Sequence, residues 1–310
     1  MIAQKNSEPW VFLNGRFVPY SQAVIPVDTH ALHYGTGCFE GIRGYFNEEE
    51  KTLFVFRLKD HYQRLHRSSA TLMMKIPYTV SELCAITIKL LEKNNDHEDV
   101  YIRPLVYKKD STVTKFNLEQ LSDGLVIFTK PLGRYLNVSQ GISVIVSSWH
   151  RVDSRMIPPF AKPTGLYLNT CLSNTQASQK GVAEAILPNA DGSIAEGSAE
   201  NIFLVIKGQL VTPSKDQNIL EGVTRATIIK LARSLLRLKV QERKVMKNEL
   251  VTASEIFLTG TGAEVTPVIK VDGKKIGEGN VGPITSKLQK LYFDIVHGEN
   301  PRYKKWLTAV

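Results

Sequence analysis

Residues 220–226 read Leu220-Glu-Gly-Val-Thr-Arg-Ala226, and apolar residues at helical spacing follow them: Ile228, Ile229, Ala232, Leu235 and Leu236. This pattern predicts a helix over residues 224–238. The first N–H groups of a helix lack partners within it and lie at its positive dipole end, so a glycine followed by a hydroxyl residue suits phosphate binding. The same pattern is also that of an ordinary capped helix start, so both interpretations stay open.

Strands and helices are mixed along the rest of the chain. Asn14-Gly15 between two apolar runs predicts a tight hairpin, and Thr79-Val-Ser-Glu82 predicts a capping box before a helix. Further strands are expected at 39–46, 53–56, 100–107, 125–129, 142–146, 183–187, 201–205 and 255–259, and further helices at 58–73, 168–180 and 283–297. This order lacks strict βαβ alternation, so we expect α+β domains and no doubly wound parallel sheet. No G-x-G-x-x-G motif opens a helix, and no Walker loop occurs.

The chain has 310 residues, which is enough for two compact domains. Around residues 131–140 neither helical nor strand periodicity persists, and Pro131, Gly133 and Asn137 interrupt the chain. We therefore expect a smaller N-terminal domain over residues 1–130, an interdomain connector over 131–140 and a larger C-terminal domain over 141–310.

Composition limits the possible classes of protein. Hydrophobic residues make up 43% and charged residues 22%, as in a globular protein with a substantial core. The apolar runs are too short to span a membrane, and the N-terminal residues resemble no targeting signal, so we expect a cytoplasmic protein. Cys38, Cys84 and Cys171 have the spacing of neither a disulfide framework nor a metal site, so no metal is expected. The net charge of +9 is dispersed, which argues against a nucleic-acid partner.

Three further features are ambiguous when each is taken alone. Gly260-Thr-Gly262 after a strand either turns the chain or directs N–H groups at an anion. Glu196 lies among apolar and small residues, where a buried carboxylate needs a partner, or it is an exposed hairpin residue. Lys162 precedes Pro163 and so avoids helical geometry, which many lysines do.

In combination, the ordered motifs resemble the class IV pyridoxal-phosphate aminotransferases, most closely the branched-chain amino acid aminotransferases. The resemblance covers nearly the whole chain. The matching segments are Ala31-Leu-His-Tyr-Gly-Thr-Gly-Cys-Phe-Glu-Gly-Ile-Arg43, Val55-Phe-Arg57, Tyr101-Ile-Arg-Pro104, Ile157-Pro158, Ala161-Lys162 with Gly165 and Tyr167, Ala195-Glu-Gly-Ser-Ala-Glu-Asn-Ile-Phe203, Leu220-Glu-Gly-Val-Thr-Arg225 and Gly260-Thr-Gly-Ala-Glu-Val-Thr-Pro267.

The resemblance implies a two-domain fold like that of D-amino acid aminotransferase, with pyridoxal 5′-phosphate as cofactor. Lys162, carried by the larger C-terminal domain, would form the Schiff base and move the proton, and Glu196 would pair with the pyridine nitrogen. Tyr167 would bind the phenolic oxygen of the cofactor. The phosphate would be held by Arg57, Val223, Thr224 and Thr261.

The family's substrate site is expected at a further set of residues. These are Tyr34, Phe39, Tyr101, Arg103, Leu132, Tyr135 and Gly262. Tyr101 and Arg103, with the turn at Thr261 and Gly262, match the groups that receive the substrate carboxylate, although Tyr101 and Phe39 also suit the core. The resemblance further implies a homodimer or higher homo-oligomer in which Tyr34 and the loop 108–116 serve the partner's site.

The implied reaction is a ping-pong transamination between L-leucine, L-isoleucine or L-valine and 2-oxoglutarate, a step of branched-chain amino acid biosynthesis or breakdown. Leu132 replaces a frequent tryptophan of the family, and Leu166 replaces a frequent asparagine, which favours a wider pocket for bulkier donors. D-amino acid or (R)-amine aminotransferases and aminodeoxychorismate lyases remain rival members of the fold. A basic binding protein that retains the fold is a rival of another class, which Lys162 and Glu196 disfavour.

Overall fold

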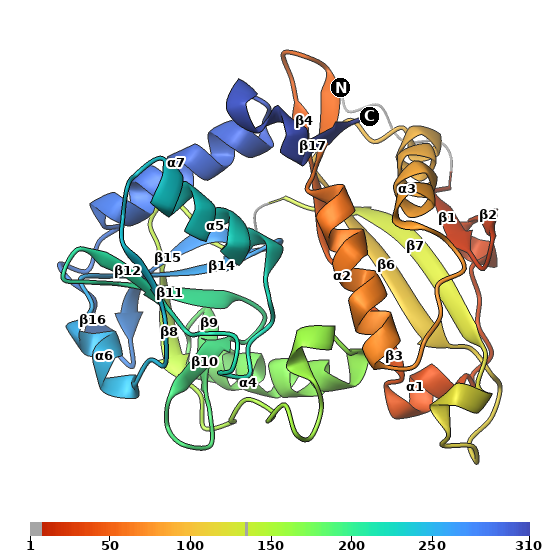
Figure 1. Ribbon diagram of the computed structural model, residues 1–310, viewed down its shortest axis with the longest axis horizontal. Helices are drawn as coiled ribbons and strands as arrows, with labels where there is room; N and C mark the ends of the chain where they lie inside the picture. The colour runs from red at the N-terminus through yellow and green to blue at the C-terminus, as the bar shows by residue number, and fades with distance from the viewer. Residues whose placement is uncertain (1–7, 134–135) are drawn as a thin grey trace. The chain divides into compact units, whose positions relative to one another are not determined.

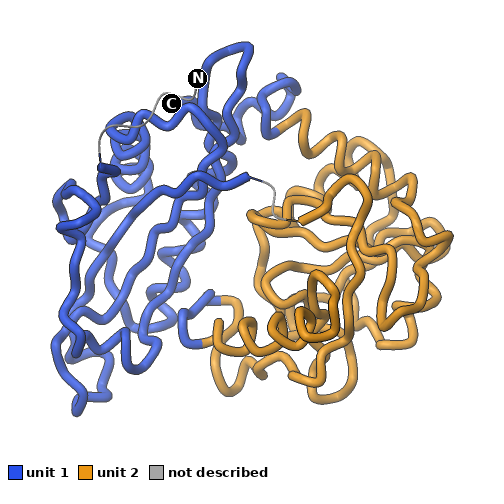
Figure 2. Tube along the Cα trace, turned by 180° about the vertical axis from the view of Figure 1, so that it is seen from behind, with its two compact units in different colours: residues 1–133, 161–165, 296–310 blue, residues 134–160, 166–295 orange. Residues whose placement is uncertain are grey.

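The computed structural model describes residues 8–133 and 136–310. The chain forms two compact units, which Figure 2 distinguishes by colour: unit 1 contains residues 1–133, 161–165 and 296–310, and unit 2 contains residues 134–160 and 166–295. Each unit is built on one sheet with helices beside it (Figure 1). The described strand pairs of unit 1 are antiparallel, whereas the sheet of unit 2 is mixed. The α+β fold class expected from the mixed order of elements is confirmed.

Unit 1 contains a sheet whose described strands follow the order β17-β5-β4-β6-β7-β1-β2, with β3 paired to β6. Helices α2 and α3 pack against each other, and their apolar residues form one core with the strands. The strands are β1 Trp10–Leu13, β2 Arg16–Pro19, β3 Gly37–Phe39, β4 Ile42–Asn47, β5 Thr52–Phe56, β6 Val100–Lys108, β7 Asp123–Pro131 and β17 Leu307–Ala309. The helices are α1 His30–Tyr34, α2 Leu58–Thr71 and α3 Val80–Asn94, with short 3-10 turns η1 Tyr20–Gln22, η2 Leu118–Gln120, η3 Pro159–Ala161, whose last residue alone belongs to this unit, and η5 Pro301–Trp306.

Unit 2 contains a sheet whose described strands follow the order β10-β9-β8-β15-β14-β11-β12-β13, with β16 paired to β15. Most pairs are antiparallel, and the pairs β8 with β9, β8 with β15 and β12 with β13 are parallel. The strands are β8 Ile142–Val146, β9 Glu184–Pro188, β10 Ile194–Gly197, β11 Asn201–Ile206, β12 Gln209–Thr212, β13 Val240–Glu242, β14 Glu255–Gly260, β15 Glu264–Val271 and β16 Lys274–Lys275. The helices are α4 Tyr167–Gln179, α5 Val223–Ser234, α6 Lys247–Thr252 and α7 Pro283–Val296, and the 3-10 turn η4 Thr164–Leu166 leads into α4.

Two local predictions are confirmed in detail. Asn14 and Gly15 have positive φ angles of 48° and 95° and join β1 to β2 in a two-residue hairpin. Thr79 Oγ1 accepts a hydrogen bond from Glu82 N at 3.2 Å, and Thr79 N donates to Glu82 Oε2 at 2.7 Å, so the capping box starts α3 as expected. The strand expected over 39–46 is instead divided into β3 and β4, because Glu40 and Gly41 interrupt the extended strand.

The expected domain boundaries differ from the compact units at two places. Residues 161–165, which include Lys162, belong to unit 1 and not to a C-terminal domain, because Thr164 Oγ1 donates to Gly35 O at 2.7 Å and Gly165 N donates to the same oxygen at 3.2 Å. Residues 296–310 also belong to unit 1, because β17 pairs with β5. The division between the units falls between residues 133 and 134, inside the expected connector.

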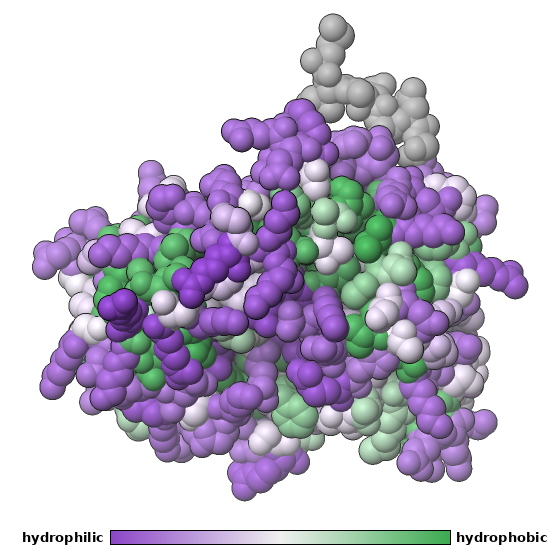
Figure 3. Space-filling view, turned by 45° about the horizontal axis from the view of Figure 1, so that its top comes forward, coloured by the Kyte–Doolittle hydropathy of each residue, from purple (hydrophilic) through white to green (hydrophobic). Residues whose placement is uncertain are grey.

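None of the helices in the described ranges is both long and apolar enough to cross a bilayer. On the face that Figure 3 shows, hydrophilic residues are spread over the surface and apolar residues lie between them.

Candidate active site

The backbone around Lys162 is held on unit 1 by the segment that ends in β3. Phe39 N donates to Lys162 O at 3.3 Å, and Cys38 and Pro163 form an isolated antiparallel bridge. Lys162 has a φ angle of +46°, in the left-handed region that non-glycine residues seldom adopt outside constrained sites. Its Nζ lies 5.1 Å from the centre of the Phe39 ring. The chain thus presents the half-buried amine on a fixed backbone next to a buried aromatic face.

Two predicted substrate residues on β6 lie at the same aromatic ring. Tyr101 and Arg103 are two residues apart on a strand and therefore share a face. Arg103 Nη2 donates to Tyr101 Oη at 2.7 Å, Arg103 Nε donates to it at 3.2 Å, and the guanidinium lies 4.1 Å from the centre of the Phe39 ring. The structure therefore brings Lys162, Phe39, Tyr101 and Arg103 together in unit 1. A guanidinium and an amine beside one ring form a site suited to a carboxylate.

Gly41 allows Tyr101 to take this position. It lies in the break between β3 and β4, and a Cβ atom there would come 2.3 Å from Tyr101 Oη. Such a distance is far inside van der Waals contact, so any side chain at residue 41 displaces the hydroxyl. The glycine of the Phe39-Glu-Gly41 motif therefore has a steric role in the arrangement of Tyr101 and Arg103.

Arg57 stands at the junction of β5 and α2, also in unit 1. Its φ angle is +50°, and its guanidinium donates to both carboxylate oxygens of Asp60 at 3.0 and 2.9 Å. The guanidinium also lies 5.2 Å from the centre of the Trp306 ring, and Arg57 N donates to Trp306 O at 2.6 Å. The side chain is mostly buried, with 15% of its surface exposed.

The remaining predicted residues of unit 1 have other surroundings. Tyr34, at the end of α1, donates from Oη to Val113 O at 2.7 Å and packs edge-on against Phe116. Leu132 follows β7, and its carbonyl accepts a hydrogen bond from Arg43 Nη2 at 3.1 Å. The contacts described for Tyr34 and Leu132 do not join them to Lys162. Tyr135 lies outside the described residues.

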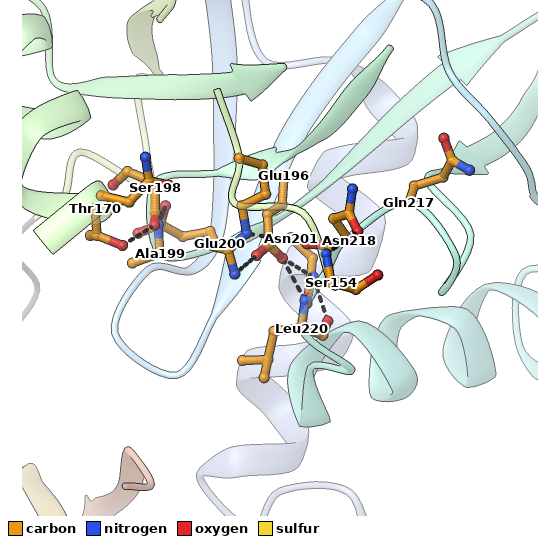
Figure 4. A network of polar contacts seen from close by, with 12 residues as sticks. Ser154, Thr170, Glu196, Ser198, Ala199, Glu200, Asn201, Gln217, Asn218 and Leu220 are labelled. Carbon is orange, nitrogen blue, oxygen red and sulfur yellow. Dashed lines mark hydrogen bonds and ion pairs between the residues drawn. The ribbon is translucent and has the colours of Figure 1, made fainter. Parts of the chain in front are cut away.

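In unit 2, Glu196 on β10 is a buried carboxylate with three donors, and it is not an exposed hairpin residue. Arg151 Nη2 lies 2.7 Å from Oε1. Asn201 Nδ2 and Leu220 N donate to Oε2 at 2.9 and 3.0 Å (Figure 4). Ion pairing and hydrogen bonding offset the cost of burying the charge.

The start of α5 lies next to this carboxylate, because Leu220 comes two residues before Gly222, the N-cap. The N-cap residue, Gly222, has no side chain that could cap the helix, and Val223 and Thr224 are buried. A Cβ atom at Gly222 would lie 2.1 Å from Asn201 Oδ1, so this close approach requires glycine. The result is a helix start with buried backbone donors, as a phosphate site requires.

The Gly260-Thr-Gly262 turn joins β14 to β15 in the same unit. Thr259, at the end of β14, is the register partner of Asn201 on β11, so their side chains share a face of the sheet. Thr261 and Gly262 follow directly in the turn and are half-buried. Tyr167 is the first residue of α4 and is also half-buried. In unit 2, Glu196 therefore lies next to the helix start at Val223 and Thr224. The turn at residues 260–262 follows β14, which pairs with β11, the strand that carries Asn201.

Sequence reasoning did not find several residues that support these groups. Arg151 lies in an irregular segment with no motif around it, and only its distance from Glu196 reveals its role. Asn201 and Trp306 were likewise not singled out, although Asn201 lies within a matching segment. The signal for Asn201 was present, because an amide at the start of a buried strand needs partners.

A buried charged cluster in unit 1 was also missed. Arg64 Nε and Nη2 donate to the two oxygens of Glu40 at 2.7 and 2.6 Å, and His61 Nδ1 lies 2.8 Å from Glu40 Oε2. Burial alone raises the pKa of Glu40, but Arg64 and His61 outweigh it and hold the pKa at about 2. Burial lowers the pKa of His61 below its ordinary value, against the opposing effect of Glu40. The cluster joins the residue after Phe39 to the helix that begins after Arg57.

Comparison with known proteins gives the class to which this fold and these groups belong. The family model "Amino-transferase class IV" matches residues 37–271, and the chain belongs to this family.

The relatives and solved structures that this chain resembles include several branched-chain amino acid aminotransferases. The "Probable branched-chain-amino-acid aminotransferase" of Aquifex aeolicus is 47% identical over 98% of this chain and 97% of its own length. The crystal structure of the branched-chain aminotransferase from Thermoproteus uzoniensis with norvaline has a TM-score of 0.93 and 40% identity, covering 98% of this chain and 99% of that one. The branched-chain amino acid aminotransferase from Thermobaculum terrenum in its PLP form has a TM-score of 0.92 and 36% identity, with 98% of both chains covered.

Proposed function

We propose that the protein is a branched-chain amino acid aminotransferase that uses pyridoxal phosphate. It transfers the amino group between L-leucine, L-isoleucine or L-valine and 2-oxoglutarate. The observation that carries the proposal is the buried Glu196 carboxylate, held by Arg151, Asn201 and Leu220 beside the start of α5, whose N-cap residue is Gly222. A buried carboxylate next to a helix start whose N–H groups can bind an anion suits a ligand with a basic ring nitrogen at one end and a phosphate at the other.

The residues present fit this cofactor. Glu196 would hold the proton on the ring nitrogen, and Tyr167 would bind the phenolic oxygen. Arg57, the backbone and hydroxyl of residues 223 and 224, and Thr261 would hold the phosphate. When bound, pyridoxal phosphate supplies the aldehyde carbon that accepts the amino group and the ring that takes up an electron pair.

The groups of unit 1 would act on the substrate. We assign to Lys162 Nζ the transfer of a proton from the substrate Cα to the carbon that carries the cofactor aldehyde, and the reverse transfer in the second half-reaction. Arg103, which Tyr101 orients through two hydrogen bonds, would bind the substrate carboxylate together with the turn at Thr261 and Gly262. Phe39 would form an apolar wall next to both cations, and Leu132 in place of tryptophan would widen the pocket toward bulkier side chains.

The proposal is tested by absorbance and half-reactions. The purified protein should be yellow, its band should shift on addition of L-leucine and return with 2-oxoglutarate, and Lys162→Ala should abolish turnover. Lys51→Ala is the matched control, because Lys51 has a similar φ angle of +50° but an exposed side chain. Turnover by Lys162→Ala at the rate of the unmodified protein would refute the assignment. A response to D-alanine or an (R)-amine but not to L-leucine would favour the rival enzymes.

We also propose a homodimer or a higher homo-oligomer. Apolar residues near α1 are unusually exposed: Val27 at 83%, Leu32 at 63% and Phe116 at 69%. Tyr34 contacts both Val113 O and Phe116, so the loop 108–116 and α1 form one apolar surface. A second copy is the occupant that this family suggests, and exposed apolar patches are typical of such interfaces. Leu32→Glu should lower the mass measured by light scattering to that of one chain.

The cytoplasmic location stays a prediction from the sequence.

A further inference from the structure

Arg57 is held by residues from two distant parts of the sequence. Its guanidinium plane is fixed on one side by both oxygens of Asp60, three residues later, and lies 5.2 Å from the ring centre of Trp306. The Arg57 backbone is tied to the same tryptophan, because Arg57 N donates to Trp306 O at 2.6 Å. The left-handed φ angle of +50° is therefore maintained by a hydrogen bond that extends the β5–β17 pairing.

Trp306 is itself firmly packed. It is the last residue of η5 and precedes β17, whose residues pair with β5 from Phe54 to Phe56. Its ring lies 4.5 Å from the ring of Tyr303 and meets Phe56 edge-on at 6.2 Å. Only 9% of the residue is exposed. The indole therefore offers a rigid plane to the guanidinium.

The ion pair with Asp60 does not by itself explain this rigidity. The Asp60 side chain is 39% exposed, and partly exposed ion pairs restrict an arginine only weakly. An aromatic face adds a second constraint, because a guanidinium stacks on it with a defined plane. A guanidinium that is already oriented loses less rotamer freedom when it binds a phosphate.

We propose that Trp306 is a positioning residue for the cofactor phosphate: it orients Arg57 and so raises affinity for pyridoxal phosphate through the phosphate group alone. The inference rests on the proposed phosphate-binding role of Arg57. It assigns a function in cofactor binding to the segment 301–310, about 250 residues away from Arg57 along the chain.

The test compares pyridoxal phosphate with pyridoxal, which lacks the phosphate. Dissociation constants of both are measured by absorbance on the full-length protein after removal of bound cofactor. Trp306→Leu should weaken binding of pyridoxal phosphate about 3- to 30-fold, the range of a buried cation–π contact, and leave binding of pyridoxal unchanged. Trp306→Phe keeps an aromatic face and should give a smaller loss in the same direction. Trp10→Leu is the control, because the Trp10 ring lies 4.2 Å from Lys93 Nζ and not on Arg57.

Arg57→Gln separates this inference from the proposed function. If Arg57→Gln does not change the preference for pyridoxal phosphate over pyridoxal, the phosphate role of Arg57 is wrong and the role of Trp306 falls with it. If Arg57→Gln removes the preference but both Trp306 variants keep it, only the inference about Trp306 is overturned. An equal loss of both ligands in the Trp306 variants also overturns it, because a merely structural role predicts that result. In the Arg57→Gln background, Trp306→Leu should have no further effect.

Discussion

Replacing Glu40 by glutamine should destabilise unit 1 strongly without changing the size of the side chain. The Glu40 carboxylate has 0% exposure and accepts two hydrogen bonds from Arg64 and one from His61. An amide keeps one acceptor oxygen and places two N–H donors opposite a guanidinium. Arg64, whose side chain is 6% exposed, is then a buried cation without its counter-ion.

Two arguments give a loss of the same order of magnitude. Breaking a buried ion pair by removing one partner costs about 3–5 kcal/mol. The gap between a folded pKa of about 2 for Glu40 and its ordinary 4.5 corresponds to about 3 kcal/mol at neutral pH. For a unit of roughly this size, such a loss lowers the melting temperature by about 6 to 20 °C.

Tryptophan fluorescence during heating can report on unit 1 alone. The chain has three tryptophans, of which Trp10 and Trp306 lie in unit 1 and Trp149 in unit 2, so Trp149→Phe provides the background. Glu48→Gln is the control, because Glu48 pairs with Lys51 at 2.8 Å with both side chains more than 70% exposed, and should shift the midpoint by less than about 1 °C. A shift of less than about 2 °C for Glu40→Gln would refute the argument from burial.

Three further outcomes follow from the contacts described above. Gly41→Ala should raise KM for L-leucine about 10-fold with little change in melting temperature. The reason is that the new Cβ displaces the Tyr101 hydroxyl that orients Arg103. An unchanged KM in steady-state assays would contradict this prediction. Gly35→Ala should lower both kcat and melting temperature, since its φ is +61° and its Cβ would lie 2.6 Å from Gly165 Cα; calorimetry and turnover measurements must show both effects together. The folded pKa values of His61 and Glu40 both lie below their unfolded values. As the pH falls, the folded state should therefore lose stability below pH 6.5, where His61 becomes protonated in the unfolded chain. It should lose the contribution of Glu40 between pH 4.5 and about pH 2. Chemical denaturation of Glu40→Gln at several pH values should therefore show its deficit shrinking below pH 4.5.

Local elements of the fold were predictable, whereas long-range pairing was not. The hairpin at Asn14 and Gly15 and the capping box at Thr79 are determined by neighbouring residues, so the sequence alone predicts them. The attachment of residues 161–165 to unit 1 depends on Gly35, which lies 129 residues from Thr164 in sequence. No periodicity in five residues indicates such a partner. For the same reason the sequence did not predict β17 or its pairing with β5.

The candidate site shows the same division. Lys162, Glu196 and Arg57 became candidates only through the order of several motifs, because each motif alone has an ordinary structural explanation. Their supporting residues carry no motif. Arg151 and Trp306 are recognisable only from their distances to Glu196 and Arg57, which depend on the folded chain.

Lys162 and Glu196, for which we propose proton transfer and binding of the ring nitrogen, belong to different compact units, and the chain passes from unit 1 to unit 2 shortly after Lys162. Hydrogen bonds from Thr164 and Gly165 to Gly35 O, and from Phe39 N to Lys162 O, fix the amine's backbone on unit 1. Two residues beyond Gly165, Tyr167 already begins α4 of unit 2. The chain therefore changes units within a few residues of Lys162, whose own φ angle is +46°. A left-handed φ angle is costly for a residue with a side chain, so the hydrogen bonds that tie residues 162–165 to Gly35 and Phe39 within unit 1 are needed to maintain it and to keep the amine beside Phe39.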